Sequence, residues 1–355
     1  RQETPGCRTV THLNNAGASL SPQPVIEAVA RHLVDEQSMG FYEAEDAARP
    51  ALARFYASIA TLLNCGVDEI AYCENSTRAW DMAFYSVRLE RGDRILTCQT
   101  EYASNFLAML QVAERKGVEI GVIPGDGSGQ IDVAALDRMI DKRTKLIAVT
   151  HVPTGGGLVN PVAKVGAIAR AHGVMFLLDA CQSVGQLPVD VQAIGCDLLA
   201  GTGRKWLRGP RATGFLYVHK SILDRLDPIF IDLHAADWVS ERSYRLRPDA
   251  KRFENWESNV AGRIGLAVAV DYALAIGIDR IAERNGKLAA GLRQQLERIP
   301  GVSVEDRGED KCAIVTFQLS GVDAASLRDQ LRARKINVSV STVGYSRLDY
   351  EPRGL

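Results

Sequence analysis

The clearest chemistry in this sequence belongs to an acid and an amine that each follow an apolar run. The run at 174–178 ends in Asp179, and Gln182 comes three residues later. A second run, at 198–200, opens into a glycine-rich segment that contains Lys205. Short apolar runs of this kind are typical of buried strands. Strands that deliver a carboxylate and an amine from their ends suit pyridoxal phosphate, whose pyridine nitrogen needs an anion and whose aldehyde needs an amine.

Two motifs around these residues resemble those of a known enzyme family. Asp179 and Gln182 form a D-x-x-Q pattern, and TGRKWLRGPRATGFLYV at 202–218 follows the family pattern S/T-G-x-K-W/L-x-G-P. The chain is similar to the fold-type I enzymes of aminotransferase class V, which include cysteine desulfurases, selenocysteine lyases, kynureninases and isopenicillin N epimerase. The likeness extends over nearly the whole chain. It implies an α/β fold with a mixed, mostly parallel seven-stranded sheet in a large domain, a small C-terminal α+β domain, and a homodimer.

The resemblance gives catalytic roles to Lys205 and Asp179. Lys205 would form the Schiff base with pyridoxal 5'-phosphate and remove the Cα proton of an amino-acid substrate. Asp179 would pair with the protonated pyridine nitrogen, and Gln182 would bind the phenolic oxygen of the ring. Without the resemblance, a lysine is more often a solvated surface group, and an aspartate is often the plain polar end of a strand.

Donors for the cofactor's phosphate are expected at two places. Ser76 and Thr77 lie at a strand-to-helix junction, where backbone N–H groups and hydroxyls bind anions. They resemble the family's phosphate turn, although a serine or threonine there also serves as an ordinary helix N-cap. Thr202 and Arg204 match the serine and histidine that flank the lysine in many cysteine desulfurases, so both are expected at the phosphate.

Two further residues are expected at the ring. Tyr102, in Glu101-Tyr-Ala-Ser-Asn105, replaces the histidine that stacks on the ring in relatives. A tyrosine can stack, but it does not shuttle protons at neutral pH as a histidine does. Thr154, in the segment HVPTGGG, takes the place of an asparagine near the phenolic oxygen; the alternative is that this glycine run is simply a flexible turn.

Other matches concern the substrate and the second subunit. Asn14, Asn15 and Ala16 resemble an N-terminal segment that lines the substrate pocket. The segment 256–258 resembles one that reaches the partner's phosphate across the dimer interface, and a structural role fits it equally well. Four arginines, at 242, 245, 247 and 252, hint at an acidic substrate group, or are solvated.

Two expected features are absent. Cysteine desulfurases carry a nucleophilic cysteine where this chain has the cysteine-free stretch 339–346, and the nearest cysteine, Cys312, reads as a core residue. The arginine segment that holds the substrate carboxylate in relatives would fall beyond Leu355. Because 351–355 follow a strand-like stretch with no closing helix, the chain is expected to be cut short.

The predicted reaction is therefore β-elimination by a C–S lyase without a persulfide-forming cysteine. An epimerase or an aminotransferase on an amino acid is the alternative within the family, because all three begin with loss of the Cα proton. An alternative of another class is a non-catalytic α/β ligand-binding module in which Lys205 is structural.

Composition excludes several classes of protein. The 355 residues contain 42 Lys and Arg against 43 Asp and Glu, so no basic field points to nucleic acid or membrane. The seven cysteines are scattered without paired spacing, which argues against a zinc site or disulfide framework and favours a reducing, cytoplasmic location. No apolar stretch approaches the ~18 residues of a spanning helix, and no secretory signal is visible at the start.

Alternating helix and strand signals predict a parallel sheet covered on both faces. We expect a large cofactor-binding domain at 20–255, and a small domain formed by 1–19 with 256–355. The stretch 240–259 lacks a sustained period and is predicted to be a connecting segment. GDGSGQ at 125–130 lacks the spacing of a dinucleotide-binding loop, and Asp132 after it is expected to cap a helix.

Overall fold

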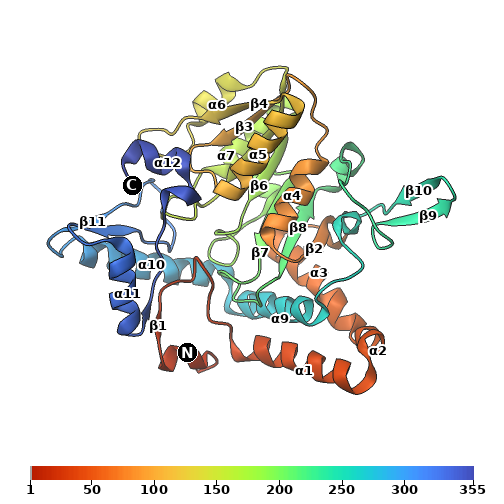
Figure 1. The fold of residues 1–355 in the computed structure, drawn as a ribbon, viewed down its shortest axis with the longest axis horizontal. Helices are drawn as coiled ribbons and strands as arrows, with labels where there is room; N and C mark the ends of the chain where they lie inside the picture. The colour runs from red at the N-terminus through yellow and green to blue at the C-terminus, as the bar shows by residue number, and fades with distance from the viewer. Residues whose placement is uncertain (1) are drawn as a thin grey trace.

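A seven-stranded sheet forms the centre of the computed structural model, which describes residues 2–355 (Figure 1). Its strands lie in the order β2 (Ile70–Cys73), β8 (Gly214–Val218), β7 (Leu198–Thr202), β6 (Met175–Asp179), β5 (Thr144–Thr150), β3 (Arg94–Cys98) and β4 (Glu119–Ile123). Within this sheet β8 runs antiparallel to both neighbours, and the other pairs are parallel. This confirms the mixed, mostly parallel seven-stranded sheet.

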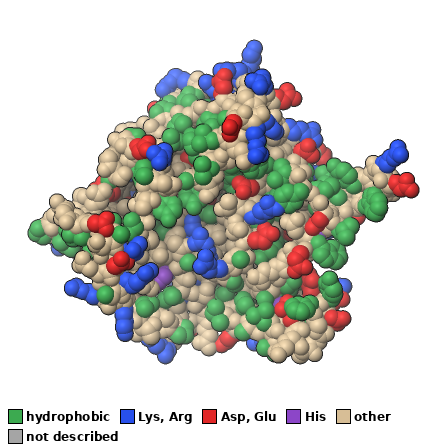
Figure 2. All heavy atoms as spheres, in the orientation of Figure 1, with side chains coloured by type: hydrophobic (Ala, Val, Ile, Leu, Met, Phe, Trp, Pro, Cys, Tyr) green, Lys and Arg blue, Asp and Glu red, His purple; other side chains and the backbone are tan. Residues whose placement is uncertain are grey.

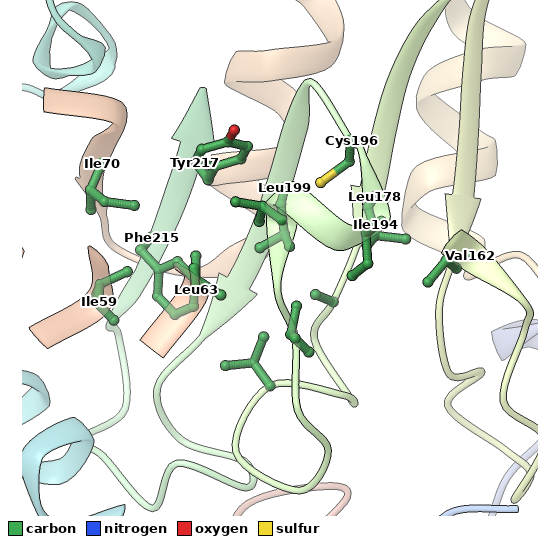
Figure 3. Close-up of a cluster of buried hydrophobic side chains, with 14 of the residues drawn as sticks. Ile59, Leu63, Ile70, Val162, Leu178, Ile194, Cys196, Leu199, Phe215 and Tyr217 are labelled. Atoms are coloured by element: carbon green, nitrogen blue, oxygen red, sulfur yellow. The ribbon is translucent and has the colours of Figure 1, made fainter. Parts of the chain in front are cut away.

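Successive residues of each strand point to opposite faces, which gives the sheet two separate cores. Phe215 and Tyr217 of β8 pack with Leu199 of β7 on one face (Figure 3), whereas Leu216 and Leu198 pack on the other. Because both faces are buried, the strands read as continuous apolar runs rather than as alternating ones.

Helices cover both faces, as parallel strands require for their crossover connections. One face packs against α3 (Arg49–Leu63), α6 (Val133–Met139), α7 (Val162–His172), α8 (Val191–Ile194) and α9 (Val260–Ile276). The other packs against α4 (Ser76–Ser86) and α5 (Ala103–Lys116). The Asp132 side chain accepts a hydrogen bond from the Ala135 N–H, which confirms it as the cap of α6.

The first and last parts of the chain lie side by side. Strand β1 (Thr11–His12) pairs in parallel with β13 (Ile336–Asn337). The remaining elements here are α1 (Gln23–Met39), α2 (Phe41–Ala47), α10 (Ile278–Leu296), β11 (Val302–Val304), β12 (Phe317–Leu319) and α11 (Ala324–Ala333). Helix α9 packs on α1 and α3. The division into domains at 20–255 and at 1–19 with 256–355 stays a prediction.

Two expectations for irregular segments were wrong. The predicted connecting segment contains part of a hairpin, β9 (Ala236–Ser240) with β10 (Ser243–Leu246), which projects from the body (Figure 1). A register shift beside Ser243 interrupts the alternation of side chains that would reveal the hairpin in the sequence. The cross-strand pair Trp238–Tyr244 stabilises the hairpin. The chain also ends in a helix, α12 (Arg347–Arg353), which Asp349 and Arg353 support as a charge pair four residues apart.

Within residues 2–355 no single helix is long and apolar enough to cross a membrane. The pair α9 and α10 passes that test together, by length and composition alone, and it is bent by 77°. Most of α9 is buried inside the protein, against α1, α3 and the sheet.

A buried ion pair joins α10 to the glycine turn at 155–157. Arg293 Nε donates to Asp306 Oδ2 at 2.7 Å, and the Asp306 side chain is fully buried. Asp306 Oδ1 accepts from the Gly157 N–H at 2.9 Å, and Arg293 also donates to the Cys312 carbonyl. One carboxylate therefore holds a helix and a turn that lie far apart in the sequence.

Removing that carboxylate is expected to destabilise the protein strongly. Asp306→Ala leaves a buried guanidinium without its counter-charge, which costs about 3–5 kcal/mol. The exposed pair Arg49–Asp46 offers a matched control, because Asp46→Ala breaks an ion pair that contributes ~1 kcal/mol or less. Urea unfolding of both variants measures the difference, and equal losses of unfolding free energy would contradict the expectation.

Candidate active site

One cavity collects the polar residues at the carboxyl ends of the parallel strands, where ligands bind in open α/β sheets. Its empty space, open solvent at the mouth included, is about 660 Å³. All nine residues predicted to bind the cofactor line it: Ser76, Thr77, Tyr102, Thr154, Asp179, Gln182, Thr202, Arg204 and Lys205. It is also lined by Asn75, Thr150, Val152 and Cys181, for which the sequence predicted no role.

The proposed catalytic pair comes from adjacent strands. Asp179 is the last residue of β6, and Lys205 follows the end of β7, to which β6 is paired. Their exposed fractions are 5% and 9%. The loop carrying Lys205 packs closely on Gly185, whose φ is +91° and where a Cβ atom would lie 2.7 Å from the Leu207 nitrogen. Glycine is therefore required there, so that the loop can approach.

Two donors fix the Asp179 carboxylate. Asn105 Nδ2 donates to Oδ2 at 2.8 Å, and the Cys181 N–H donates to Oδ1 at 2.9 Å. A buried carboxylate needs such donors, because an unpaired charge in an apolar setting is costly. Sequence reasoning missed both donors. Asn105 lies in the motif that contains Tyr102, but only the fold shows that its amide reaches β6.

The start of α4 is suited to an anion. Asn75, rather than Ser76 or Thr77, is the N-cap: its Oδ1 accepts from the Arg78 N–H at 2.8 Å. The alternative role of Ser76 and Thr77 as the N-cap was therefore wrong, and neither side chain is used for capping. Gly214 lets β8 approach this turn, since a Cβ atom there would lie 2.8 Å from the Asn75 carbonyl carbon. The free N–H groups and the helix dipole both favour negative charge.

The N-terminal segment contacts two of the residues that line the cavity. Gln182 Nε2 donates to the Ala16 carbonyl at 3.0 Å, and the Arg204 guanidinium donates to the Gly17 carbonyl. Asn15 Oδ1 accepts from the Ser19 hydroxyl at 3.0 Å, whereas Asn14 Oδ1 is buried without a hydrogen-bond partner among residues 2–355. Ala16 thus lies next to the predicted cofactor ligands. The roles of Asn14, Asn15 and Ala16 in binding substrate stay predictions.

The four arginines near the hairpin do not line this cavity, so the structure gives no support for an acidic substrate group held by them. Arg245 pairs with Asp237 and Arg247 with Asp249, while Arg252 donates to the Arg247 and Leu223 carbonyls. Arg242 is exposed at the hairpin turn. The segment 256–258 begins at the exposed Trp256 and is not among the residues that line the cavity.

A second buried carboxylate lies behind Asp179. Glu101 is 2% exposed and accepts from Thr150 Oγ1 at 2.6 Å, from Thr97 Oγ1 at 3.0 Å and from Asn105 Nδ2 at 2.9 Å. Burial raises the pKa of Glu101 to about 7, and the nearby Asp179 adds to that rise, against the opposing effect of the Thr150 and Asn105 hydrogen bonds. The Asn105 amide therefore joins two carboxylates.

The donor set fits pyridoxal phosphate, on the geometry of the chain itself. The cavity brings together a buried carboxylate, an amine, an amide, an aromatic ring and a helix N-terminus with two hydroxyls that capping does not use. A pyridine nitrogen, an aldehyde, a phenolic oxygen, a ring face and a phosphate need these five kinds of partner, in that order. Asp179, Lys205, Gln182, Tyr102 and the Ser76–Thr77 turn would hold the cofactor.

Comparisons with known proteins agree with this geometry. A model of the family Aminotransferase class-V matches residues 11–346. The chain is 31% identical over 326 residues to a probable cysteine desulfurase of Methanothermobacter thermautotrophicus, covering 91% of this chain and 81% of that protein. It is 33% identical over 330 residues to a probable cysteine desulfurase of Xylella fastidiosa, covering 90% and 78%.

Solved structures give the same result. The apo cysteine desulfurase from Thermococcus onnurineus matches with a TM-score of 0.90 at 27% identity, covering all of this chain and 90% of that one. A cystine C–S lyase, in complex with its reaction product cysteine persulfide, matches with a TM-score of 0.88 at 23% identity, covering 95% and 92%. The second likeness shows the fold alone. The predicted fold class, pyridoxal-phosphate-dependent fold type I, is confirmed.

The elevated pKa of Glu101 predicts a pH-dependent stability. In the unfolded chain this glutamate loses its proton near pH 4.5, whereas in the folded chain it keeps it until about pH 7. The folded state therefore binds more protons in that window, and stability falls as pH rises through it. Glu101→Gln removes this loss of unfolding free energy, because glutamine does not titrate. Relative to wild type, the variant is expected to gain about 2–3 kcal/mol of unfolding free energy between pH 5 and pH 8.

Urea unfolding of wild type and Glu101→Gln at a series of pH values measures this gain. Comparing the two proteins at each pH cancels the titration of all groups they share. A difference in unfolding free energy that stays constant from pH 5 to pH 8 would show that Glu101 titrates as an ordinary glutamate.

Proposed function

The chain belongs to the class V aminotransferase family, whose enzymes depend on pyridoxal phosphate, and we propose that it is a C–S lyase. Its substrate would be a cysteine-derived amino acid, from which β-elimination and hydrolysis release a thiol, pyruvate and ammonia. The observation that carries the proposal is the meeting of Asp179 and Lys205 in one cavity of a chain that resembles cysteine desulfurases over nine-tenths of its length.

The residues divide the work as follows. When bound, pyridoxal phosphate supplies an electron sink for the pair left at the substrate Cα. Lys205 Nζ removes the Cα proton. The C–S bond then breaks, and the sulfur leaves with the bonding electrons as a thiolate. Asp179, held by Asn105 and the Cys181 N–H, keeps a negative charge at the pyridine nitrogen throughout.

The leaving group explains how Tyr102 can stand where relatives carry a histidine. A thiol has an ordinary pKa of ~8.5, so a thiolate leaves near neutral pH without a general acid to protonate it. An oxygen leaving group would need such an acid. The tyrosine at the ring is therefore compatible with C–S cleavage.

We propose further that no cysteine of this chain carries the sulfur as a persulfide. The stretch 339–346 contains no cysteine. Cys312 is 2% exposed, and burial raises its pKa to about 11. Cys181 lines the cavity, but burial and the nearby Asp179 raise its pKa to about 11 as well. A sulfur acceptor needs an accessible thiolate, which neither residue provides at neutral pH.

The reaction is tested with purified, cofactor-loaded protein and a panel of cystine, cysteine S-conjugates and cysteine sulfoxides. Pyruvate release is expected, together with a persulfide from cystine, a thiol from an S-conjugate or a sulfenic acid from a sulfoxide. Lys205→Ala is expected to lower the rate by about 10²–10⁴-fold or more, because it removes the base. Lys220→Ala, in an exposed short helix, is the matched control and is expected to keep full activity.

Other outcomes would change the conclusion. Deuterium exchange at Cα without any keto acid would make the protein an epimerase, and amino transfer to a keto acid would make it an aminotransferase. If Cys312→Ala or Cys181→Ala abolishes sulfur release while the cofactor stays bound, the proposal of a reaction without a protein persulfide is wrong.

We also propose a cytoplasmic homodimer. Seven cysteines without a disulfide suit a reducing compartment. Large apolar side chains are exposed on α2 and on the hairpin, among them Phe41 at 73% and Trp238 at 75%. Figure 2 shows apolar atoms gathered on the upper part of one face and along the projecting hairpin. Exposed apolar surface of this kind marks interfaces.

Light scattering coupled to size-exclusion chromatography is expected to give twice the 38.7 kDa mass of the chain. A Phe41→Asp/Trp238→Asp variant places charges on the exposed apolar side chains and is expected to lower that mass. A wild-type protein that elutes as a monomer at all concentrations would contradict the proposal.

A further inference from the structure

Trp206 follows the proposed catalytic lysine and contacts a neighbouring cofactor ligand. Its indole Nε1 donates to Gln182 Oε1 at 2.9 Å. An indole N–H only donates hydrogen bonds, so the atom of the Gln182 amide that faces it has to be the oxygen. The hydrogen-bonding chemistry of the indole therefore determines that Oε1, and not Nε2, faces Trp206.

The partners of Nε2 require the same orientation of the Gln182 amide. Gln182 Nε2 lies 3.0 Å from the Ala16 carbonyl and 3.3 Å from Thr154 Oγ1. A carbonyl oxygen only accepts, so it requires the NH₂ end of the amide. Gln182 is 2% exposed, so the partners of its amide are mainly protein groups. Inverting it would set the NH₂ against the indole N–H and one carbonyl against another.

Trp206 is itself firmly held. Its ring packs on a small apolar cluster of Val152, Cys312 and Ile314, which Ala16 also joins. The backbone at Trp206 lies against Gly185, where a Cβ atom would come within 2.7 Å of it. An indole packed in this way holds its N–H in one direction.

We propose that Trp206 is a positioning residue that keeps the NH₂ of Gln182 available to the phenolic oxygen of the cofactor. The Ala16 carbonyl accepts one N–H, and the second, whose contact with Thr154 Oγ1 is the longer one, would be donated to that oxygen. This rests on the proposed role of Gln182, and it does not depend on which substrate is cleaved. An N–H donor stabilises the ionised form of that oxygen. That oxygen would share a proton with the nitrogen through which Lys205 would hold the cofactor, so the donor would lower the pH at which this nitrogen loses its proton.

Trp206→Phe keeps an aromatic ring in the cluster and removes the N–H. One of the two contacts that orient the Gln182 amide is then lost, and only the Ala16 carbonyl opposes inversion. The inverted amide, which presents its oxygen to the ionised phenolic oxygen, is therefore expected to be populated more. The pH midpoint of the visible absorption band of the loaded protein is expected to rise by about one unit, the equivalent of ~1.4 kcal/mol. A spectrophotometric pH titration without substrate measures it.

Two further variants separate this role from a structural one. In Trp206→His, Nε2 occupies the same ring position as the indole Nε1 and can still donate, so the midpoint is expected to return toward wild type. Trp238→Phe makes the same substitution at the exposed hairpin and is expected to leave the midpoint unchanged.

A double-variant cycle tests whether Trp206 acts through Gln182. Gln182→Leu is expected to raise the midpoint, and adding Trp206→Phe to it should raise it no further. Additive shifts, an unchanged midpoint in Trp206→Phe, or loss of cofactor uptake in Trp206→Phe alone would overturn the proposal. If Gln182→Leu itself leaves the midpoint unchanged, the proposed role of Gln182 is wrong. Neither titration result bears on the lyase proposal, which the pyruvate assay tests separately.

Discussion

The site depends on keeping a carboxylate buried and charged beside an amine at the end of a sheet. Asp179 has both oxygens occupied, one by the Asn105 side chain and the other by the Cys181 N–H. The first donor comes from the helix after β3 and the second from the turn after β6. Only a parallel arrangement brings these two carboxyl ends to the same edge, so the strand order is a condition for the chemistry.

The sequence was sufficient for the parts of the site that lie within single motifs. Each of the nine predicted cofactor residues lines the cavity, because each lies at the end of a strand or in the connection just after it, and the βαβ pattern determines the direction of these strands. The interactions that the sequence did not predict are contacts between different motifs. Asn105 reaching Asp179 is a contact across 74 residues, and Trp206 reaching Gln182 depends on how one loop packs. The spacing of residues within a motif does not indicate either contact.

The missed elements have a similar explanation. The hairpin around Trp238 lies on the surface, so no buried face imposes a period of two, and a register shift breaks what alternation there is. Helix α12 lacks an apolar stripe and is supported by charge pairs four residues apart, of which Arg353 with Asp349 is one. Hydrophobic periodicity detects elements that face a core, and neither of these presents such a pattern.

The two buried carboxylates clarify how a single charge is kept at the cofactor. Asn105 donates one N–H to Glu101 and the other to Asp179. Glu101 accepts several hydrogen bonds that favour its charged form, yet burial outweighs them and its pKa rises to about 7. Near neutral pH the rear position is therefore readily protonated, which removes a like charge from behind Asp179. The network concentrates negative charge on the carboxylate that faces the cavity, where the pyridine nitrogen requires it.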